Sequence, residues 1–204
     1  MKYAIVTGGT SGIGLGVAKM LLDKGYYVIA TYCGPVFSEK LTNYEAVLTD
    51  QTSRHAVYAF LDYVKNKTDH IDCLICNAGM SIRKSFTETT DEEWDKQMEV
   101  AVNSHYIMVR ELFPLIPDGS RIIFTGSQMA IHPHATVLCY GVTKSAVCAL
   151  AKNLVKEFEG TGTTVNAVIP GFVEPLGRKK NQNKLNRTFI RRQPSIASRQ
   201  LMKL

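Results

Sequence analysis

Residues 7–14 read Thr-Gly-Gly-Thr-Ser-Gly-Ile-Gly, and they lie between an apolar segment and an amphipathic stretch. A glycine-rich turn between a strand and a helix lets backbone N–H groups approach a phosphate at the positive end of the helix dipole. In such a turn Gly8 reverses the chain, Gly12 permits close approach of the ligand, and Gly14 permits tight contact between helix and strand. We therefore expect a pyrophosphate-binding turn here, although the spacing G-x-x-x-G-x-G also fits a plain loop.

Apolar runs alternate with amphipathic stretches beyond this turn. The alternation is typical of repeated strand-helix-strand units, which build a parallel sheet covered by helices on both faces. The expected strands are residues 3–7, 27–31, 45–48, 71–76, 121–125 and 164–168. The expected helices are residues 14–24, 53–65, 91–115 and 136–158, the third with a buried stripe at Trp94, Met98, Val102 and Tyr106. The sequence thus predicts a doubly wound, Rossmann-like α/β fold in a single domain, residues 1–174.

Charge is distributed unevenly along the 204 residues. The net charge is +6, but residues 178–204 hold nine Lys or Arg and no acid, which leaves residues 1–177 with 15 basic against 18 acidic groups. The basic segment lacks interleaved aromatic residues and a clear amphipathic period, so we expect no nucleic-acid partner and no membrane partner. The chain has no apolar run of about 18 residues and no N-terminal leader pattern, so we expect a cytoplasmic protein.

The five cysteines are odd in number and lie in apolar segments, which predicts reduced thiols rather than disulfides. Cys73 and Cys76 form a C-x-x-C pattern within an apolar run. We expect these two residues to pack in the core, because no second pair of ligands completes a metal site. His132 and His134 also lack a nearby third ligand, and we expect them to have a structural role in a loop or to line the mouth of the substrate site.

Three further segments carry chemistry. Asn77-Ala78-Gly79 follows the strand 71–76, Ser127 follows the strand 121–125, and Tyr140 and Lys144 are four residues apart on one helix face. A free phenol has a pKa of about 10, and an ammonium group one helical turn away favours its ionised form. We therefore expect Tyr140 to be the general acid in carbonyl reduction and the general base in alcohol oxidation. Lys144 would also donate to the ribose hydroxyls of a nicotinamide cofactor, and Ser127 would orient the substrate oxygen.

Together these segments resemble the short-chain dehydrogenase/reductase family, most broadly its 3-oxoacyl carrier-protein reductases, over residues 1–174. The resemblance implies an enzyme that transfers hydride between NAD or NADP and a carbonyl or secondary alcohol of a small molecule. It implies a homo-oligomer, a dimer or tetramer, and a water held by Asn103 that links Lys144 to solvent. The cofactor-binding residues that it implies are Thr7, Gly8, Thr10, Ser11, Gly12, Ile13, Gly14, Tyr32, Asp50, Asn77, Ala78, Gly79, Tyr140, Lys144, Pro170 and Gly171.

The choice between NAD and NADP depends on the end of the second strand. Residues 30–34 read Ala-Thr-Tyr-Cys-Gly, with neither the acid that suits a free ribose hydroxyl nor an arginine that suits a phosphate. The missing carboxylate favours NADP slightly. The resemblance places Asp50 at the adenine amino group, but a turn that caps the helix after Thr52 explains Asp50 equally well.

The resemblance ends after Glu174. The substrate-covering lid and the last strand of the family do not follow, and residues 175–204 are expected to form an irregular basic tail. A codon reading displaced by two bases turns this tail into a segment that resembles the missing lid, so we hypothesise an out-of-frame tail, which the coding DNA decides. The alternative function is therefore a dinucleotide-binding module with impaired catalysis.

Overall fold

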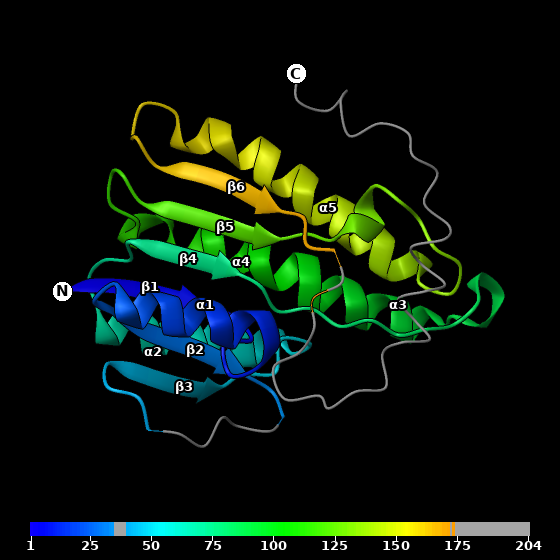
Figure 1. Ribbon diagram of the computed structural model, residues 1–204, viewed down its shortest axis with the longest axis horizontal. Coiled ribbons are helices and arrows are strands. Elements are labelled where there is room, and N and C mark those ends of the chain that lie inside the picture. Colours follow the sequence, from blue (N-terminus) through cyan, green and yellow to red (C-terminus); the bar gives the residue numbers. More distant parts are fainter. Residues whose placement is uncertain (35–39, 172, 174–204) are drawn as a thin grey trace. The chain divides into compact units, whose positions relative to one another are not determined.

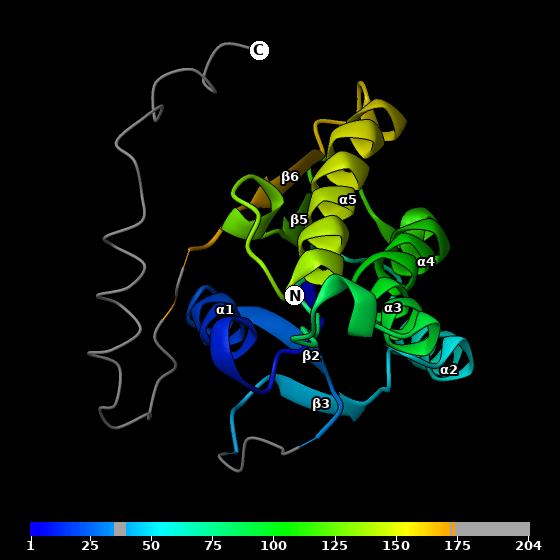
Figure 2. The same cartoon turned by 90° about the vertical axis from the view of Figure 1, so that its right-hand side faces the viewer.

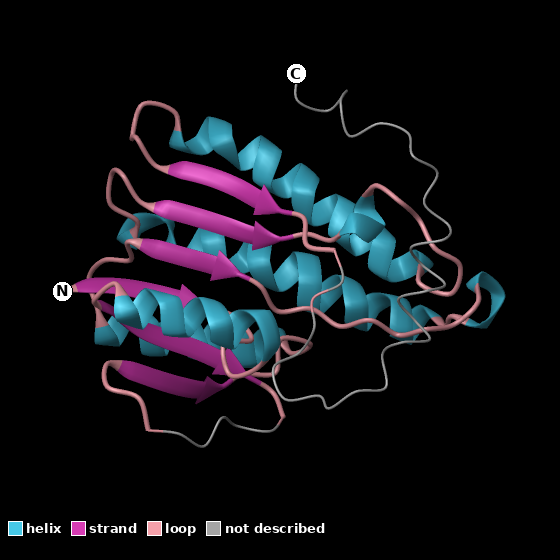
Figure 3. Ribbon diagram, in the orientation of Figure 1, coloured by secondary structure: helices cyan, strands magenta, loops and turns pink. Residues whose placement is uncertain are grey.

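The computed structural model describes residues 1–34, 40–171 and 173, and the expected tail 175–204 lies outside the described residues. Six parallel strands form one sheet in the order β3-β2-β1-β4-β5-β6 (Figures 1 and 3). The strands are β1 (Lys2–Val6), β2 (Tyr26–Tyr32), β3 (Tyr44–Leu48), β4 (Cys73–Cys76), β5 (Arg121–Thr125) and β6 (Thr164–Val168). The central strand β1 pairs with β2 on one side and with β4 on the other, with Ala4 opposite both Val28 and Cys73. The predicted parallel α/β sheet is confirmed.

Helices cover both faces of this sheet. Figure 2 shows α1 against one face and α2, α4 and α5 against the other. The helices are α1 (Gly12–Asp23), α2 (Arg54–Lys67), α3 (Asp91–Met98), α4 (Ser104–Leu112) and α5 (Leu138–Leu154), with shorter helical turns η1 (Phe86–Glu88), η2 (Glu99–Asn103), η3 (Phe113–Leu115), η4 (Gln128–Ala130) and η5 (Val155–Phe158). No helix among the described residues is long and apolar enough to span a bilayer.

The strands read as short apolar runs because both faces of the sheet are covered. One hydrophobic cluster joins the sheet to α2, α4 and α5 through residues such as Phe60 and Leu112, and a second joins it to α1 through Ala18 and Leu21. Cys73 and Cys76 are 5% and 0% exposed and are free thiols. The prediction that this C-x-x-C pair packs in the core is therefore confirmed.

The third expected helix, residues 91–115, is not uniform. Its middle, η2 (Glu99–Asn103), is a π-helix, in which the backbone N–H of Ser104 reaches the carbonyl of Glu99. A π-helical turn holds more residues than an α-helical turn, so the side chains that follow it point in new directions. Tyr106, which was expected in the buried stripe, is 47% exposed, whereas Ser104 and His105 are 0% and 1% exposed. The predicted stripe is therefore wrong at Tyr106.

The chain reverses its direction across the sheet between β1 and β4. β1 leads through α1 to β2 on one side, whereas β4 leads to β5 on the other. Ligands of open parallel sheets bind at such a switch point, outside the carboxyl ends of the strands. The turn 7–14 and the segment 77–79 both leave strands at this point.

Candidate functional site

The turn between β1 and α1 has the geometry that its glycines predict. Gly8 has a φ of 63°, in the left-handed region that favours glycine. A Cβ on Gly14 would lie 2.1 Å from the carbonyl oxygen of Gly8, so a side chain cannot fit there. Ser11 precedes α1 without forming a side-chain cap, and the first turn of the helix has no acidic residue. The N–H groups at this helix end are therefore suited to a phosphate.

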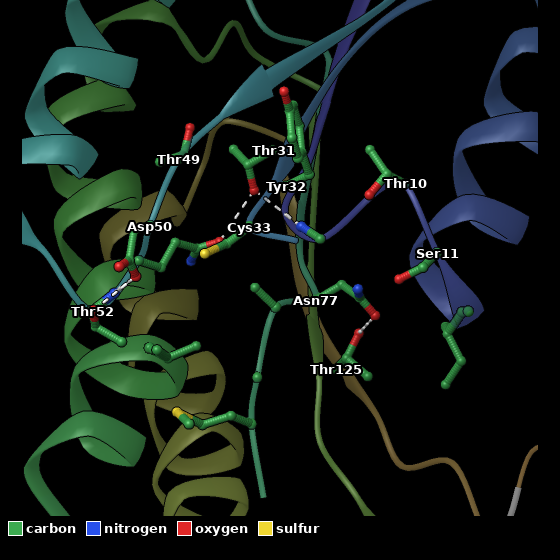
Figure 4. Close-up of a pocket in the computed structure, with 18 of the residues that line it drawn as sticks. Thr10, Ser11, Thr31, Tyr32, Cys33, Thr49, Asp50, Thr52, Asn77 and Thr125 are labelled. Carbon is green, nitrogen blue, oxygen red and sulfur yellow. Dashed lines mark hydrogen bonds between the residues drawn. The ribbon is translucent and has the colours of Figure 1, made fainter. Parts of the chain in front are cut away.

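The hydroxyl of Thr7 joins this turn to the segment after β4. Thr7 is fully buried, and its Oγ1 accepts hydrogen bonds from the backbone N–H groups of Asn77 and Ala78, both at 2.8 Å. The Asn77 Nδ2 donates to the carbonyl of Thr7 at 3.0 Å, and its Oδ1 accepts from Thr125 Oγ1 at 3.2 Å (Figure 4). Thr7, Asn77 and Thr125 thus hold the carboxyl ends of β1, β4 and β5 together.

A second series of hydrogen bonds links the backbone of Gly8 to α4. The Gly8 N–H donates to Thr31 Oγ1 at 3.0 Å, and Thr31 donates to Gln51 Oε1 at 3.1 Å (Figure 4). Gln51 Nε2 donates to Ser104 Oγ at 2.8 Å, and Ser104 donates to the Val100 carbonyl at 2.7 Å. Thr31, Gln51 and Ser104 are at most 5% exposed. The glycine turn is therefore fixed to the start of α4.

A cavity of about 740 Å³ borders Gly8, Thr31 and Gln51. It extends between residues at the ends of β1, β2, β3 and β4 and residues on α5, and its size suits a dinucleotide-sized ligand. The described residues that line it are Gly8, Thr10, Ser11, Gly12, Ile13, Thr31, Tyr32, Cys33, Thr49, Asp50, Gln51, Thr52, Asn77, Ala78, Gly79, Met80, Val100, Thr125, Tyr140 and Lys144.

The residues present fit a nicotinamide dinucleotide. The glycine turn and the uncapped N-terminus of α1 suit its pyrophosphate. Gly79 brings the turn 77–79 close to the lysine, because a Cβ at this position would lie only 3.2 Å from Lys144 Nζ. Tyr32 and Asp50 line the same cavity at the ends of β2 and β3.

Asp50 lines the cavity and also holds a local turn. Its Oδ1 accepts from the backbone N–H of Thr52 at 2.9 Å and from the Thr52 hydroxyl at 2.7 Å (Figure 4). Both expectations for Asp50, a ligand contact and a capping turn, are compatible with this position. Its contact with adenine stays a prediction.

Tyr140 and Lys144 lie on the face of α5 that borders the cavity. Lys144 is 3% exposed, its Nζ donates to the Thr125 carbonyl at 2.6 Å, and the same atom lies 5.7 Å from the centre of the Tyr140 ring. Burial lowers the pKa of Lys144 to about 8, because the charged ammonium loses water. The ammonium and the phenol are therefore close enough for the charge of one to act on the other.

Ser127 has a different environment. It is 8% exposed, precedes η4, and its Oγ accepts from the backbone N–H of Met129 at 3.2 Å. The described residues that line the cavity do not include Ser127, Pro170 or Gly171. The expected contact of Ser127 with a substrate oxygen stays a prediction.

Asn103 is also absent from the described cavity lining. Its Nδ2 donates to Glu99 Oε2 at 2.7 Å, and the Glu99 carboxylate pairs with Arg54 at 2.7 Å. Val100 is the residue of η2 that lines the cavity. The structure thus gives the Asn103 amide another partner than the expected water, and the relay stays a prediction.

The sequence did not single out Thr31, Gln51, Ser104 or His105. Thr31 is the penultimate residue of β2, and Gln51 lies three residues after the end of β3, so their positions could have marked them as residues at the carboxyl edge of the sheet. Ser104 and His105 carried no such signal, because the π-helical turn that directs them inward is not visible in the hydrophobic pattern.

Comparison with known proteins decides the family. A family model described as short chain dehydrogenase matches residues 2–186. The chain belongs to the short chain dehydrogenase family. It is 34% identical over 184 residues to a 2-dehydro-3-deoxy-D-gluconate 5-dehydrogenase of Pseudoalteromonas atlantica, a match that covers 85% of this chain and 72% of that protein.

Two more relatives of this short chain dehydrogenase agree. A 3-oxoacyl-[acyl-carrier-protein] reductase of Haemophilus influenzae is 31% identical over 179 residues, which cover 84% of this chain and 74% of that protein. A solved short chain dehydrogenase from Burkholderia cenocepacia, in complex with NADP, matches with a TM-score of 0.79 and 27% identity, over 92% of this chain and 81% of that one. The family resemblance and the Rossmann-like fold predicted from the sequence are confirmed, and the protein is an oxidoreductase.

Proposed function

We propose that this chain transfers hydride between a nicotinamide dinucleotide and a carbonyl or secondary alcohol of a small molecule, with Tyr140 as general acid and base. The observation that carries the proposal is the position of Lys144. Its buried ammonium lies 5.7 Å from the Tyr140 ring, and both residues line the cavity that begins at the glycine turn. A plain structural pair on a helix surface would not share a cavity with a phosphate-binding turn.

Different residues along the cavity bind the cofactor and transfer the proton. The N–H groups at the start of α1 bind the pyrophosphate, and the turn 77–79 forms the wall between this end and Lys144. When bound, the nicotinamide supplies or accepts the hydride. The Tyr140 hydroxyl gives its proton to the carbonyl oxygen in reduction, and the ionised phenol takes a proton from the alcohol in oxidation.

Lys144 supports the proton transfer in two ways. Its ammonium stabilises the ionised phenol by charge, in a site where burial weakens the competition from water. Its Nζ has three donors, and the bond to the Thr125 carbonyl uses one of them. The other two remain available for ribose hydroxyls. Ser127 would hold the substrate oxygen and Asn103 the water that links Lys144 to solvent.

For the cofactor we propose NADP ahead of NAD. The residues that line the cavity at the end of β2 are Thr31, Tyr32 and Cys33, none of which is an acid. A carboxylate at this place would repel a 2′-phosphate. The Burkholderia relative with bound NADP supports the same choice. Titrations with NADPH and NADH, side by side, test it, and tighter binding of NADH would contradict it.

A Tyr140→Phe variant tests the enzymatic function. We expect loss of carbonyl-dependent NADPH oxidation, measured with a panel of small carbonyl compounds, and unchanged affinity for NADPH. Equal turnover of Tyr140→Phe and the parent protein would contradict the role of Tyr140. NADPH binding without turnover in the parent protein would favour the alternative, a binding module with impaired catalysis.

The expected homo-oligomer is a separate proposal. Light scattering on the purified chain tests it, and a monomer at micromolar concentration would contradict it.

A further inference from the structure

His105 is a buried ionisable residue that the proposed mechanism does not use. It lies on α4, is 1% exposed, and packs edge-on against Phe124 of β5, with 6.3 Å between the ring centres. Its Nε2 lies 3.1 Å from the hydroxyl of Thr7.

The direction of the hydrogen bond between His105 and Thr7 follows from the other bonds of Thr7. A threonine hydroxyl has two acceptor positions and one proton. The N–H groups of Asn77 and Ala78 occupy both acceptor positions, each at 2.8 Å. Thr7 must therefore donate its proton, and the imidazole at 3.1 Å is a closer acceptor than the Ile75 carbonyl at 3.4 Å.

The direction of this hydrogen bond fixes the tautomer of the imidazole. Nε2 accepts, so the proton of a neutral His105 is on Nδ1. Nδ1 has no hydrogen-bond partner of good geometry among the described residues. An unpaired buried N–H costs free energy, and a leucine at this position would avoid that cost. The feature that an imidazole supplies and a leucine does not is the hydrogen-bond acceptor at Nε2.

The oriented hydroxyl of Thr7 acts on the wall of the cavity. The segment that it holds, residues 77–79, contacts both ends of the site. A Cβ on Gly14 would lie 2.7 Å from Asn77 Nδ2, and one on Gly79 would lie 3.2 Å from Lys144 Nζ. A small displacement of this segment therefore alters both the glycine turn and the surroundings of the lysine.

We propose that His105 is a positioning residue for the nucleotide cavity. Its imidazole accepts a hydrogen bond from the Thr7 hydroxyl, and this bond directs the acceptor positions of the hydroxyl oxygen toward the backbone N–H groups of residues 77 and 78. The effect on the nucleotide rests on the proposed function, whereas the hydrogen-bond arrangement does not. The two parts are therefore tested separately.

The first test uses the unaltered protein without nucleotide. The nitrogen chemical shifts of ¹⁵N-labelled histidine distinguish a protonated from an unprotonated ring nitrogen. We expect His105 at neutral pH to carry its proton on Nδ1, and a proton on Nε2 would overturn the proposal. This result does not depend on whether a nucleotide binds.

The second test compares variants. His105→Gln retains an acceptor near the position of Nε2, whereas His105→Leu does not. We expect His105→Leu to weaken NADPH binding about three- to ten-fold, the worth of one hydrogen bond, and to speed hydrogen exchange at the amides of Asn77 and Ala78. His105→Gln should restore both properties. Met108→Leu, a fully buried substitution on the same helix, is the matched control and should change neither.

A double-variant cycle separates positioning from general loosening of the core. In a Thr7→Val background His105→Leu should have no further effect on NADPH affinity, because the hydrogen bond is already lost. Equal effects of His105→Leu in both backgrounds, or unchanged amide exchange in His105→Leu, would overturn the proposal. Absence of NADPH binding in the unaltered protein would overturn the proposed function and the effect on the nucleotide, while the histidine shifts would still decide the hydrogen bond.

Discussion

Two groups of polar residues at opposite ends of the sheet differ in the partners that they bind. The carboxyl-end network consists of Thr7, Thr31, Gln51, Ser104 and His105, all at most 5% exposed, and it reaches the backbone of the glycine turn and of residues 77 and 78. The Glu45 cluster lies near the starts of β2 and β3, where the carboxylate of Glu45 binds the side chains of Tyr27, Tyr63 and Lys67.

The difference separates positioning from surface stabilisation. In the carboxyl-end network a lost partner leaves a buried polar atom without water, which is costly. In the Glu45 cluster the Glu45 and Lys67 side chains are 30% and 34% exposed, so water replaces a lost partner. We expect substitutions near the carboxyl-end network to alter nucleotide binding and turnover, and substitutions in the Glu45 cluster to alter stability slightly.

The largest expected effect on turnover comes from replacing Lys144. Lys144→Met should lower carbonyl-dependent turnover by roughly 10²- to 10⁴-fold, the range for loss of general acid-base catalysis, because the ionised phenol loses its neighbouring charge. Lys67→Met in the Glu45 cluster is the matched control and should retain parental turnover. Initial rates at saturating NADPH measure both, and similar losses in the two variants would remove the distinction between the two ends.

A pair of glycines on α1 tests the glycine turn. Gly14→Ala places a Cβ 2.1 Å from the Gly8 carbonyl oxygen, so the turn must move. We expect a loss of about 1–3 kcal/mol in the free energy of unfolding and loss of NADPH binding. A Cβ on Gly16 meets no atom within 4 Å, so Gly16→Ala should stabilise the helix by about 0.5–1 kcal/mol and retain binding. Denaturant unfolding and NADPH titration measure the contrast; equal behaviour of the two variants would contradict it.

The pH dependence of stability tests the buried histidine. Burial and, to a smaller extent, the nearby Lys144 ammonium lower the pKa of His105 to about 3, although a hydrogen bond of poor geometry to the Ala101 backbone opposes them. The unfolded chain takes up this proton near pH 6.5, whereas the folded protein does so only near pH 3, so stability is full above pH 6.5 and falls as the pH falls.

We expect His105 to contribute a slope of about 1.4 kcal/mol per pH unit between these values. His105→Gln does not titrate, so its free energy of unfolding should fall less steeply between pH 6.5 and 5. Carboxylates such as Glu45 and Glu99 are common to both proteins and cancel in the comparison. Parallel pH profiles of the two proteins would show that His105 titrates normally.

The smallest expected effect is in the Glu45 cluster. Burial raises the pKa of Glu45, but hydrogen bonds from Lys67, Tyr27 and Tyr63 outweigh it, so that the net pKa is lowered. Glu45→Gln should nevertheless cost only about 1 kcal/mol or less in the free energy of unfolding, because the group is partly exposed. Thermal unfolding and NADPH titration measure it, and a loss of nucleotide affinity would mean that the two ends of the sheet are coupled.

The sequence predicted the sheet well because buried parallel strands carry their own signal. The strands over residues 121–125 and 164–168 match the structure at both ends, and the glycine turn has the positive φ at Gly8 and the tight contact at Gly14 that its spacing predicts. These features depend on local chain geometry and on burial from both sides. Both are visible in a short stretch of residues.

The support beneath the site was not predictable in the same way. The π-helical turn η2 shifts the inward face of the following helix, so Ser104 and His105 are buried and Tyr106 is exposed. Gln51 pairs with Ser104 across 53 residues, and Thr7 meets His105 across 98 residues. Such pairings depend on the complete packing of α4 against the sheet, which a hydrophobic period does not encode.

The assignment of the cavity is tested by titrating the unaltered chain, Gly14→Ala and Glu45→Gln with NADPH and measuring the change in nucleotide fluorescence on binding. We expect saturable binding at one site per chain in the unaltered chain and in Glu45→Gln, and none in Gly14→Ala. Absence of saturable binding in the unaltered chain, or equal binding by Gly14→Ala, would contradict the assignment of the cavity to a nicotinamide dinucleotide.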